Sequence, residues 1–194
     1  MGERTARIQA TRERIVEAAI ELYTELGVSA TTMRQIGERA DVAPGTLRNH
    51  FATRDDLDRA MVERLTAEIP LPDLSLYDGA TSIDERLRRL IRATGTFLDQ
   101  ARRLYRMWLR EPLLSGPWAE AGATYGARWD DLMRTALGPL ADDGDATAVL
   151  RAVSEPTFWD HLRGGTRTTD EACALITAVI VPWFAFREAN RSRG

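Results

Sequence analysis

The sequence is poor in the residues that metal sites, disulfides and most active sites require. It contains one cysteine, Cys173, and two histidines, His50 and His161, far apart in the chain. A single cysteine cannot form an internal disulfide, and these three residues do not supply the ligand cluster of a zinc site. No glycine-rich phosphate loop or Ser-His-Asp motif is present. We expect no metal, no cofactor and no enzymatic activity.

Long hydrophobic runs are also scarce. The longest uncharged apolar stretch, Ala172 to Phe186, has 15 residues and contains Pro182, whereas a bilayer requires about 20. The first fourteen residues carry charge throughout and lack the apolar core of a secretory signal. We therefore predict a cytoplasmic protein with no membrane partner.

Lysine is absent, so all 26 basic residues are arginine. The net charge is −3, but residues 1–54 hold eight arginines and seven acidic residues. Four of these arginines, at positions 4, 7, 12 and 14, open the chain, and three more surround one short segment, at positions 34, 48 and 54. Local positive charge of this kind is what binding to a phosphate backbone requires.

Apolar residues recur at the helical period, and no β-alternation of useful length is visible, so we predict an all-α fold. The first helix spans 8–26 and a short second helix starts at Thr31 or Thr32. Asp41 to Gly45 predicts a turn before a third helix at 46–51.

A fourth helix is expected at 54–69, with Thr53 and Asp56 forming a capping box. Residues 70–82 follow as a loop, and further helices continue to about residue 190, with a break at Pro156. We predict a three-helix N-terminal domain at 1–53, a connecting helix at 54–69, and a helical C-terminal domain at 70–194.

Residues 31–51, TTMRQIGERADVAPGTLRNHF, predict a helix-turn-helix. Two short helices joined by a tight turn allow the second to lie in the major groove of DNA while the first crosses the backbone. The apolar positions are spaced to pack this pair against the first helix. Their polar neighbours have side chains suited to phosphates and base edges. These neighbours are Arg34, Gln35, Thr46, Arg48, Asn49 and His50.

The stretch from about Arg12 to Leu57 resembles the N-terminal pattern of the tetracycline-repressor (TetR) family. Shared features are a long helix that ends in glycine, a Thr-Thr start, and a Gly-Thr-Leu recognition helix closing in His-Phe. The matching positions are Gly27, Thr31, Thr32, Ile36, Ala40, Val42, Gly45, Thr46, Leu47, His50 and Phe51. The resemblance adds Thr32, Pro44, Gly45 and Arg54 to the predicted DNA-binding residues.

Three positions depart from the family pattern: Arg48 replaces the usual Tyr, Asn49 a frequent His, and Asp41 a common Gly. Aspartate tolerates the left-handed turn conformation, so the fold is retained. Arginine can pair with a phosphate or bind guanine O6 and N7 bidentately. We expect Arg48 to change the operator preference rather than abolish DNA binding.

In this family the C-terminal helices form the dimer and enclose a small-molecule pocket. Aromatic and soft side chains concentrate in the middle of the chain and could line such a site, although ordinary core packing is the alternative for each. The predicted effector-binding residues are Phe97, Tyr105, Met107, Trp108, Trp118, Tyr125 and Trp129.

The uncharged stretch Ala172 to Phe186 carries apolar residues on nearly every face of a helix, so it must be covered on more than one side. A two-fold partner is the expected cover, and the alternative is a central helix of a monomeric bundle. The predicted dimer residues are Val149, Val153, Trp159, Ile176, Val179, Ile180 and Trp183.

The resemblance implies a ligand-responsive regulator, a repressor that binds a palindromic operator as a homodimer. A small apolar or aromatic molecule would release it by shifting the helix at 54–69 and so changing the separation of the two reading heads. The remaining alternatives are an enzyme and a helical adaptor that has lost DNA binding.

Overall fold

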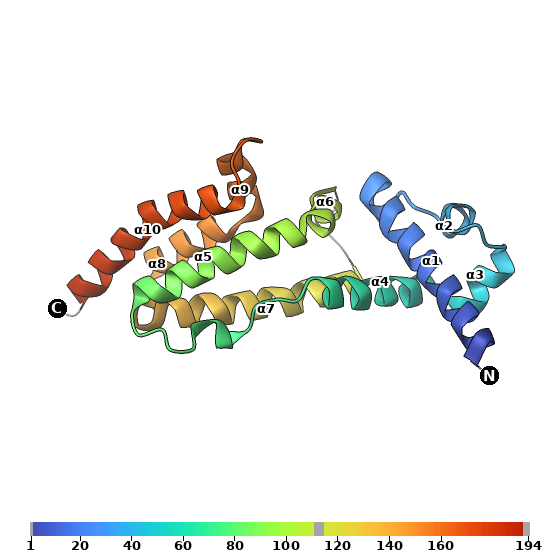
Figure 1. Cartoon of the computed structure of the whole chain (residues 1–194), viewed down its shortest axis with the longest axis horizontal. Helices are drawn as coiled ribbons and strands as arrows, with labels where there is room; N and C mark the ends of the chain where they lie inside the picture. Colours follow the sequence, from blue (N-terminus) through green and yellow to red (C-terminus); the bar gives the residue numbers. More distant parts are fainter. Residues whose placement is uncertain (1, 111–114, 192–194) are drawn as a thin grey trace. The chain divides into compact units, whose positions relative to one another are not determined.

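The computed structural model describes the backbone of residues 2–110 and 115–191, and the side chains of these residues except 108–110. Within these ranges the chain is helical with no strand, which confirms the all-α prediction (Figure 1). The helices are α1 (Gly2–Leu26), α2 (Met33–Arg39), α3 (Pro44–His50), α4 (Arg54–Glu68), α5 (Ile83–Gln100), α6 (Arg102–Arg110), α7 (Pro117–Leu137), α8 (Gly144–Ser154), α9 (Pro156–Arg163) and α10 (Thr169–Arg191), with 3-10 turns η1 (Leu74–Tyr77) and η2 (Gly138–Leu140).

The chain forms two compact units, neither of which is continuous in sequence. The N-terminal unit consists of Met1–Ile69 and Arg102–Ala123, and the C-terminal unit of Pro70–Ala101 and Thr124–Gly194. The N-terminal unit thus contains α4, α6 and the first residues of α7 in addition to α1, α2 and α3.

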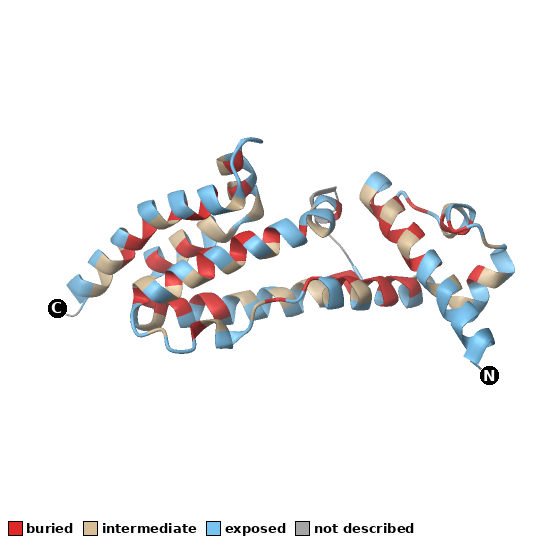
Figure 2. Cartoon of the chain, viewed as in Figure 1, coloured by how far each residue is buried: buried red, intermediate tan, exposed pale blue. Residues whose placement is uncertain are grey.

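The core of the N-terminal unit is built on α1, which buries a stripe at helical spacing that includes Ile15, Ala19, Leu22 and Tyr23 (Figure 2). The helix begins at Gly2, six residues before the predicted start. Residues 2–10 are all exposed, so no apolar period marks them in the sequence, and good helix formers extend the helix instead.

Caps define the helices of the helix-turn-helix. Thr32 and Gln35 form a capping box at the start of α2, and the predicted box of Thr53 and Asp56 starts α4. Helix α3 begins at Pro44, two residues earlier than predicted, because proline suits the first position of a helix, where its missing N–H is not needed.

In the C-terminal unit α5 packs along α10, and α9 packs against both α8 and α10. Gly95 of α5 lies where a larger side chain would meet Thr169 and Trp159. The predicted break at Pro156 is present: α8 ends at Ser154, and Pro156 is the first residue of α9.

Helix α10 is, in the described part of the chain, the one helix long and apolar enough to cross a membrane by length and composition. It is longer than the 15-residue apolar stretch because polar residues extend both ends. Its buried residues, which include Ile176, Val181 and Phe184, belong to the core of the C-terminal unit. A core helix in a soluble protein meets the same criterion.

Candidate nucleic-acid interface

The turn between α2 and α3 is closed by backbone geometry. Asp41 adopts the left-handed conformation, with a φ of 51°, as its residue type allows. The Val42 N–H then donates to the Gly37 carbonyl at 3.0 Å. A Cβ at Gly37 would lie 3.5 Å from Leu47 Cδ2, so α3 approaches α2 closely at this point. The buried Leu47 and Phe51 fix α3 to the rest of the unit.

The outer surface of this motif carries most of the predicted DNA-binding residues. Arg48 and Asn49 are exposed, and no ion pair or hydrogen bond within the described ranges engages the Arg48 guanidinium. A Cβ added at Gly45 would meet nothing within 4 Å, so the fold does not require glycine there. The other exposed members of the set are Thr32, Arg34, Pro44 and Gly45, and Gln35, Thr46 and His50 are half-buried.

Three predicted residues, Thr32, Arg34 and Gln35, also make local contacts at α2. The Thr32 hydroxyl accepts from the Gln35 backbone N–H at 3.3 Å, and the Thr32 N–H donates to the Gln35 side chain at 2.8 Å. Arg34 forms an ion pair with Glu38 one turn later, at 3.3 Å, with both side chains largely exposed. Such an exposed pair stabilises little, so Arg34 remains available to a phosphate.

Arg54 points into the protein. Its Nη1 donates to the Thr31 carbonyl and its Nη2 to the Val28 carbonyl, both at 2.7 Å. Its guanidinium carbon lies 4.7 Å from the centre of the Tyr23 ring. These contacts fix the segment that leads into α2, so Arg54 supports the helix-turn-helix from within, a role that its position beside a basic segment did not indicate.

A buried polar pair, missed in the sequence, lies next to Arg54. The Tyr23 hydroxyl donates to Asp58 Oδ1 at 2.5 Å, and Arg54 Nε lies 3.4 Å from the same oxygen. Burial raises the pKa of the Asp58 carboxyl despite these two contacts. Burial, followed by the bond to Asp58, raises the pKa of Tyr23. The pair joins α1 to α4.

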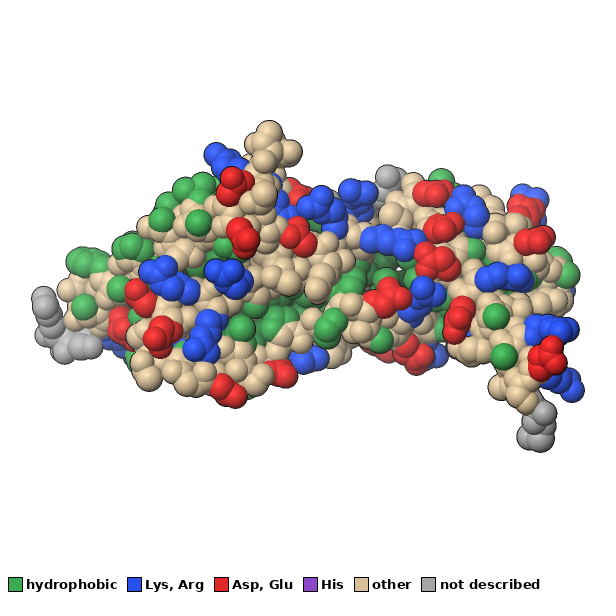
Figure 3. Space-filling model, viewed as in Figure 1, with side chains coloured by type: hydrophobic (Ala, Val, Ile, Leu, Met, Phe, Trp, Pro, Cys, Tyr) green, Lys and Arg blue, Asp and Glu red, His purple; other side chains and the backbone are tan. Residues whose placement is uncertain are grey.

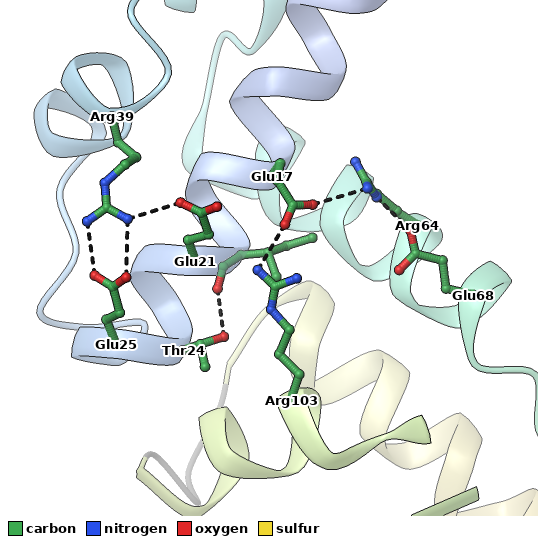
Figure 4. Close-up of polar contacts among 9 residues, drawn as sticks. Glu17, Glu21, Thr24, Glu25, Arg39, Arg64, Glu68 and Arg103 are labelled. Carbon is green, nitrogen blue, oxygen red and sulfur yellow. Dashed lines mark hydrogen bonds and ion pairs between the residues drawn. The ribbon is translucent and has the colours of Figure 1, made fainter. Parts of the chain in front are cut away.

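Ion pairs on the surface of the N-terminal unit tie α1 to its neighbours (Figure 4). Arg39 of α2 donates to Glu21 and Glu25 of α1, each at 3.0 Å. The bond from Arg39 lowers the pKa of Glu25. Glu17 of α1 contacts α4 and α6 as well: its two carboxylate oxygens pair with Arg64 at 3.1 Å and Arg103 at 2.9 Å.

The structure divides the predicted effector-binding residues between the two units. In the C-terminal unit, the Phe97 ring centre lies 6.1 Å from that of Tyr125 and 5.4 Å from that of Trp129. In the N-terminal unit, Met107 and Trp118 are buried in the core, where the Trp118 ring centre lies 6.3 Å from that of Tyr23.

The two other predicted effector residues lie on α6. Tyr105 is half-buried, and the side chain of Trp108 lies outside the described residues. A groove of about 560 Å³ runs between α1 and α4. Its lining is mostly charged or polar, which does not suit an apolar effector. The lining residues are Gln9, Arg12, Glu13, Val16, Ala60, Glu63 and Arg64.

The predicted dimer residues differ in exposure. Trp159, Ile176 and Ile180 are buried within the C-terminal unit. Val149, Val153 and Trp183 are half-buried. Val179 is 65% exposed. With Leu175 and Phe186, Val179 forms an exposed apolar stripe along α10, and hydrophobic side chains are visible over this helix in Figure 3.

No group of three or more His, Cys, Asp or Glu side chains within the described residues is placed to hold a metal ion. The exposed side chains of the helix-turn-helix surface offer the Thr32 hydroxyl, the Asn49 amide and the guanidinium groups of Arg34 and Arg48. These groups suit recognition of phosphates and base edges.

Comparison with known proteins identifies the N-terminal segment. Residues 15–61 match the family model for bacterial regulatory proteins of the tetR family. The chain is 34% identical to the HTH-type transcriptional regulator TcmR of Streptomyces glaucescens over 56 residues, 29% of this chain and 25% of the relative. It is 37% identical to the HTH-type transcriptional regulator UidR of Escherichia coli K12 over 54 residues, 28% of each chain. The matches thus span about a quarter of the length of these relatives.

Similarity over the remainder of the chain is structural. A TetR-like transcriptional regulator from Rhodococcus sp. RHA1 superposes with a TM-score of 0.64 at 20% identity, and the match covers 91% of this chain and 96% of the other. At this identity the likeness establishes the fold. Each of the relatives named above is a transcriptional regulator by name. Residues 15–61 thus match the tetR family of bacterial regulatory proteins, and nearly the whole chain shares the fold of a TetR-like regulator.

Proposed function

We propose that the chain is a cytoplasmic, ligand-responsive transcriptional repressor that binds a palindromic operator as a homodimer. The observation that carries this proposal is the outer surface of α3, where Arg48 and Asn49 are exposed on a motif that matches the tetR family model. Exposed donors on the second helix of a helix-turn-helix have the chemistry and the placement for base edges in the major groove.

The start of α3 is proposed to approach the DNA backbone. Gly45 and Thr46 lie in the first turn of this helix, where unpaired backbone N–H groups favour a phosphate. Nothing within the described part of the chain requires glycine at position 45, so we attribute this glycine to the close approach of the DNA backbone. Arg48, one turn further, is then the side chain best placed for a base or a flanking phosphate.

Binding experiments with Arg48→Ala test this proposal. A duplex selected by the wild-type chain from a randomised library serves as the probe, with point changes at each position. If Arg48 contacts a guanine, the variant loses discrimination at one position, by about 1–3 kcal/mol. A uniform loss across all sequences identifies Arg48 as a phosphate contact. The absence of DNA binding by the wild-type chain at low salt refutes the regulator and favours the adaptor alternative.

The proposed dimer uses the exposed apolar stripe Leu175, Val179 and Phe186 on α10. Apolar side chains of this size at helical spacing favour a second copy of the same helix as their cover. Val179→Glu alters a side chain that is largely exposed in the single chain, so folding is retained. We expect the variant to sediment as a monomer and to lose operator binding. A wild-type chain that sediments as a monomer at micromolar concentration refutes the dimer.

The proposed effector is apolar or aromatic, and its site includes Phe97, Tyr125 and Trp129. These rings are half-buried, and Phe97 packs near both of the others, which leaves aromatic surface for a ligand. Effector binding is proposed to change the separation of the two α3 helices of the dimer, and so to release DNA. Trp129→Ala should weaken quenching of tryptophan fluorescence by aromatic ligands, and unchanged quenching argues against this site.

A further inference from the structure

The first turns of α1 form a helical arm that the fold does not use. Every residue from Gly2 to Ala10 is exposed, and Figure 2 shows these turns pale blue. Hydrogen bonds within the helix, such as that from the Gln9 side chain to Glu13 at 3.0 Å, are its local support. Packing in the protein core therefore does not explain which residues occur in this arm.

Three arginines share one face of α1: Arg4 and Arg7 lie in the arm, and Arg14 lies about one turn beyond it. Arg4, Arg7 and Arg14 are separated by three and seven residues, which places them within about 80° of one another around a helix of 3.6 residues per turn. From Arg4 to Arg14 the helix rises about 15 Å, at 1.5 Å per residue. Successive phosphates on one DNA strand advance by about 3.4 Å along the axis, so such a row spans several phosphates.

These three arginines differ from Arg39 and Arg64 of the same unit in their ion pairing. No ion pair or hydrogen bond among the described residues engages the guanidinium group of Arg4, Arg7 or Arg14. Arg39 and Arg64, in contrast, each contact two carboxylates. The charge of the arm is thus available to a partner that carries negative charge.

Contacts made by Arg12 place the base of the arm at the end of the reading helix. Arg12 Nη1 donates to the His50 carbonyl at 3.3 Å, and its guanidinium carbon lies 4.3 Å from the centre of the Phe51 ring. His50 is the last residue of α3. The base of the arm therefore lies beside the end of α3, within the same compact unit.

We propose that Arg4, Arg7 and Arg14 form a second DNA contact, a row of phosphate-binding arginines that extends the footprint of α3 along the backbone. The inference rests on the proposed function, because it requires DNA on α3. The contact carries no sequence information of its own. It adds affinity for any duplex and increases the dependence of binding on salt.

A triple variant, Arg4→Gln, Arg7→Gln and Arg14→Gln, tests this contact, with the purification tag at the C-terminus. A matched control, Arg88→Gln, Arg92→Gln and Arg134→Gln, removes the same charge from exposed positions in the C-terminal unit. Each protein is titrated from 50 to 200 mM salt with two 40-base-pair duplexes, one selected by the wild-type chain and one of arbitrary sequence.

Each lost phosphate contact reduces the slope of log affinity against log salt by about 0.9. If all six contacts of a two-fold dimer form, the slope falls by about 5. The ratio of the wild-type affinity to that of the arm variant then decreases about 1,000-fold between 50 and 200 mM salt. The loss should be equal on both duplexes, since phosphates are the same in each. The control should retain the wild-type slope.

Equal slopes for the wild type and the arm variant overturn the inference and leave the proposed function intact. An equal loss in the control also overturns it, because the effect would then be one of total charge. A wild-type chain that binds neither duplex at 50 mM salt refutes the proposed function itself. Circular dichroism and thermal unfolding of the arm variant should match the wild type, since no packing is removed.

Discussion

Substitution of Gly95 by alanine tests the packing of α5 against α10. A Cβ at this position would lie 2.8 Å from Thr169 Cγ2, 2.9 Å from Trp159 Cζ3 and 3.0 Å from Cys173 Sγ. Carbon atoms in ordinary contact lie about 3.5–4.0 Å apart. The added methyl group therefore requires its neighbours to move.

Neither of the two nearest neighbours moves cheaply. Trp159 is fully buried, and its indole N–H donates to the Val153 carbonyl at 2.8 Å. The Thr169 hydroxyl donates to Asp99, which also pairs with the buried Arg163 at 3.0 Å. Rotation of Thr169 away from the new methyl group would break its hydrogen bond to Asp99 and disturb the ion pair between Asp99 and Arg163. Overpacking of such a site costs about 1–3 kcal/mol.

Alanine also favours helix over glycine by about 1 kcal/mol, which opposes the cost of the clash. Gly126→Ala, in the middle of α7, provides the matched control, because a Cβ there meets nothing within 4 Å. The gain in helix propensity is common to both variants. The difference between their free energies of unfolding therefore isolates the clash and should be about 1–3 kcal/mol.

The measurement is urea unfolding followed by tryptophan fluorescence, at one protein concentration because dimerisation would shift the midpoint. Each kcal/mol corresponds to about 2–4 °C in a parallel thermal melt of a chain of this size. We expect Gly126→Ala to melt above the wild type and Gly95→Ala below the control by that margin. Equal stability of the two variants would refute the close approach of α5 and α10 at Gly95.

Three further predictions follow from single contacts. Asp143 caps α8, and hydrogen bonds from Arg187 lower the pKa of its carboxyl group. The ionised carboxylate therefore stabilises the fold above about pH 4, the usual pKa of aspartate, and this contribution is lost as the pH falls below it. Asp143→Asn should therefore destabilise the chain at pH 7, with the deficit against the wild type narrowing toward pH 3, and a constant deficit would contradict this cause. Tyr23→Phe removes the hydrogen bond to the buried Asp58 and should lower the free energy of unfolding by about 1–3 kcal/mol in urea titrations. Trp118→Ala should lower it by about 3–5 kcal/mol while leaving quenching by aromatic ligands unchanged, and lost quenching with normal stability would return Trp118 to the effector site.

Local signals in the sequence predicted the helix-turn-helix closely. Thr53 caps a helix and Asp41 adopts the left-handed conformation, and each affects only the few residues next to it. Their effect on the backbone can therefore be inferred from the sequence before the fold is known. The start of α3 was placed late because Pro44 was assigned to the turn. Proline serves equally well in a turn and at the first position of a helix.

Contacts over long sequence separation could not be predicted in this way. Periodicity indicates that Trp118 is buried but not against which helix, and it packs with Tyr23, which is 95 positions earlier. The family resemblance added Arg54 to the predicted DNA-binding residues. Its carbonyl partners, on Val28 and Thr31, belong to backbone whose position only the folded unit determines.

The discontinuity of the N-terminal unit has a consequence for how the protein emerges from the ribosome. The core around α1 includes Met107 and Trp118, so the helix-turn-helix is not fully covered when residue 69 has been synthesised. About 50 further residues must follow, which takes about 3–10 s at 5–20 residues per second. During that interval Tyr23 and its apolar neighbours lack part of their cover, and the nascent chain presents a hydrophobic surface that a chaperone could bind.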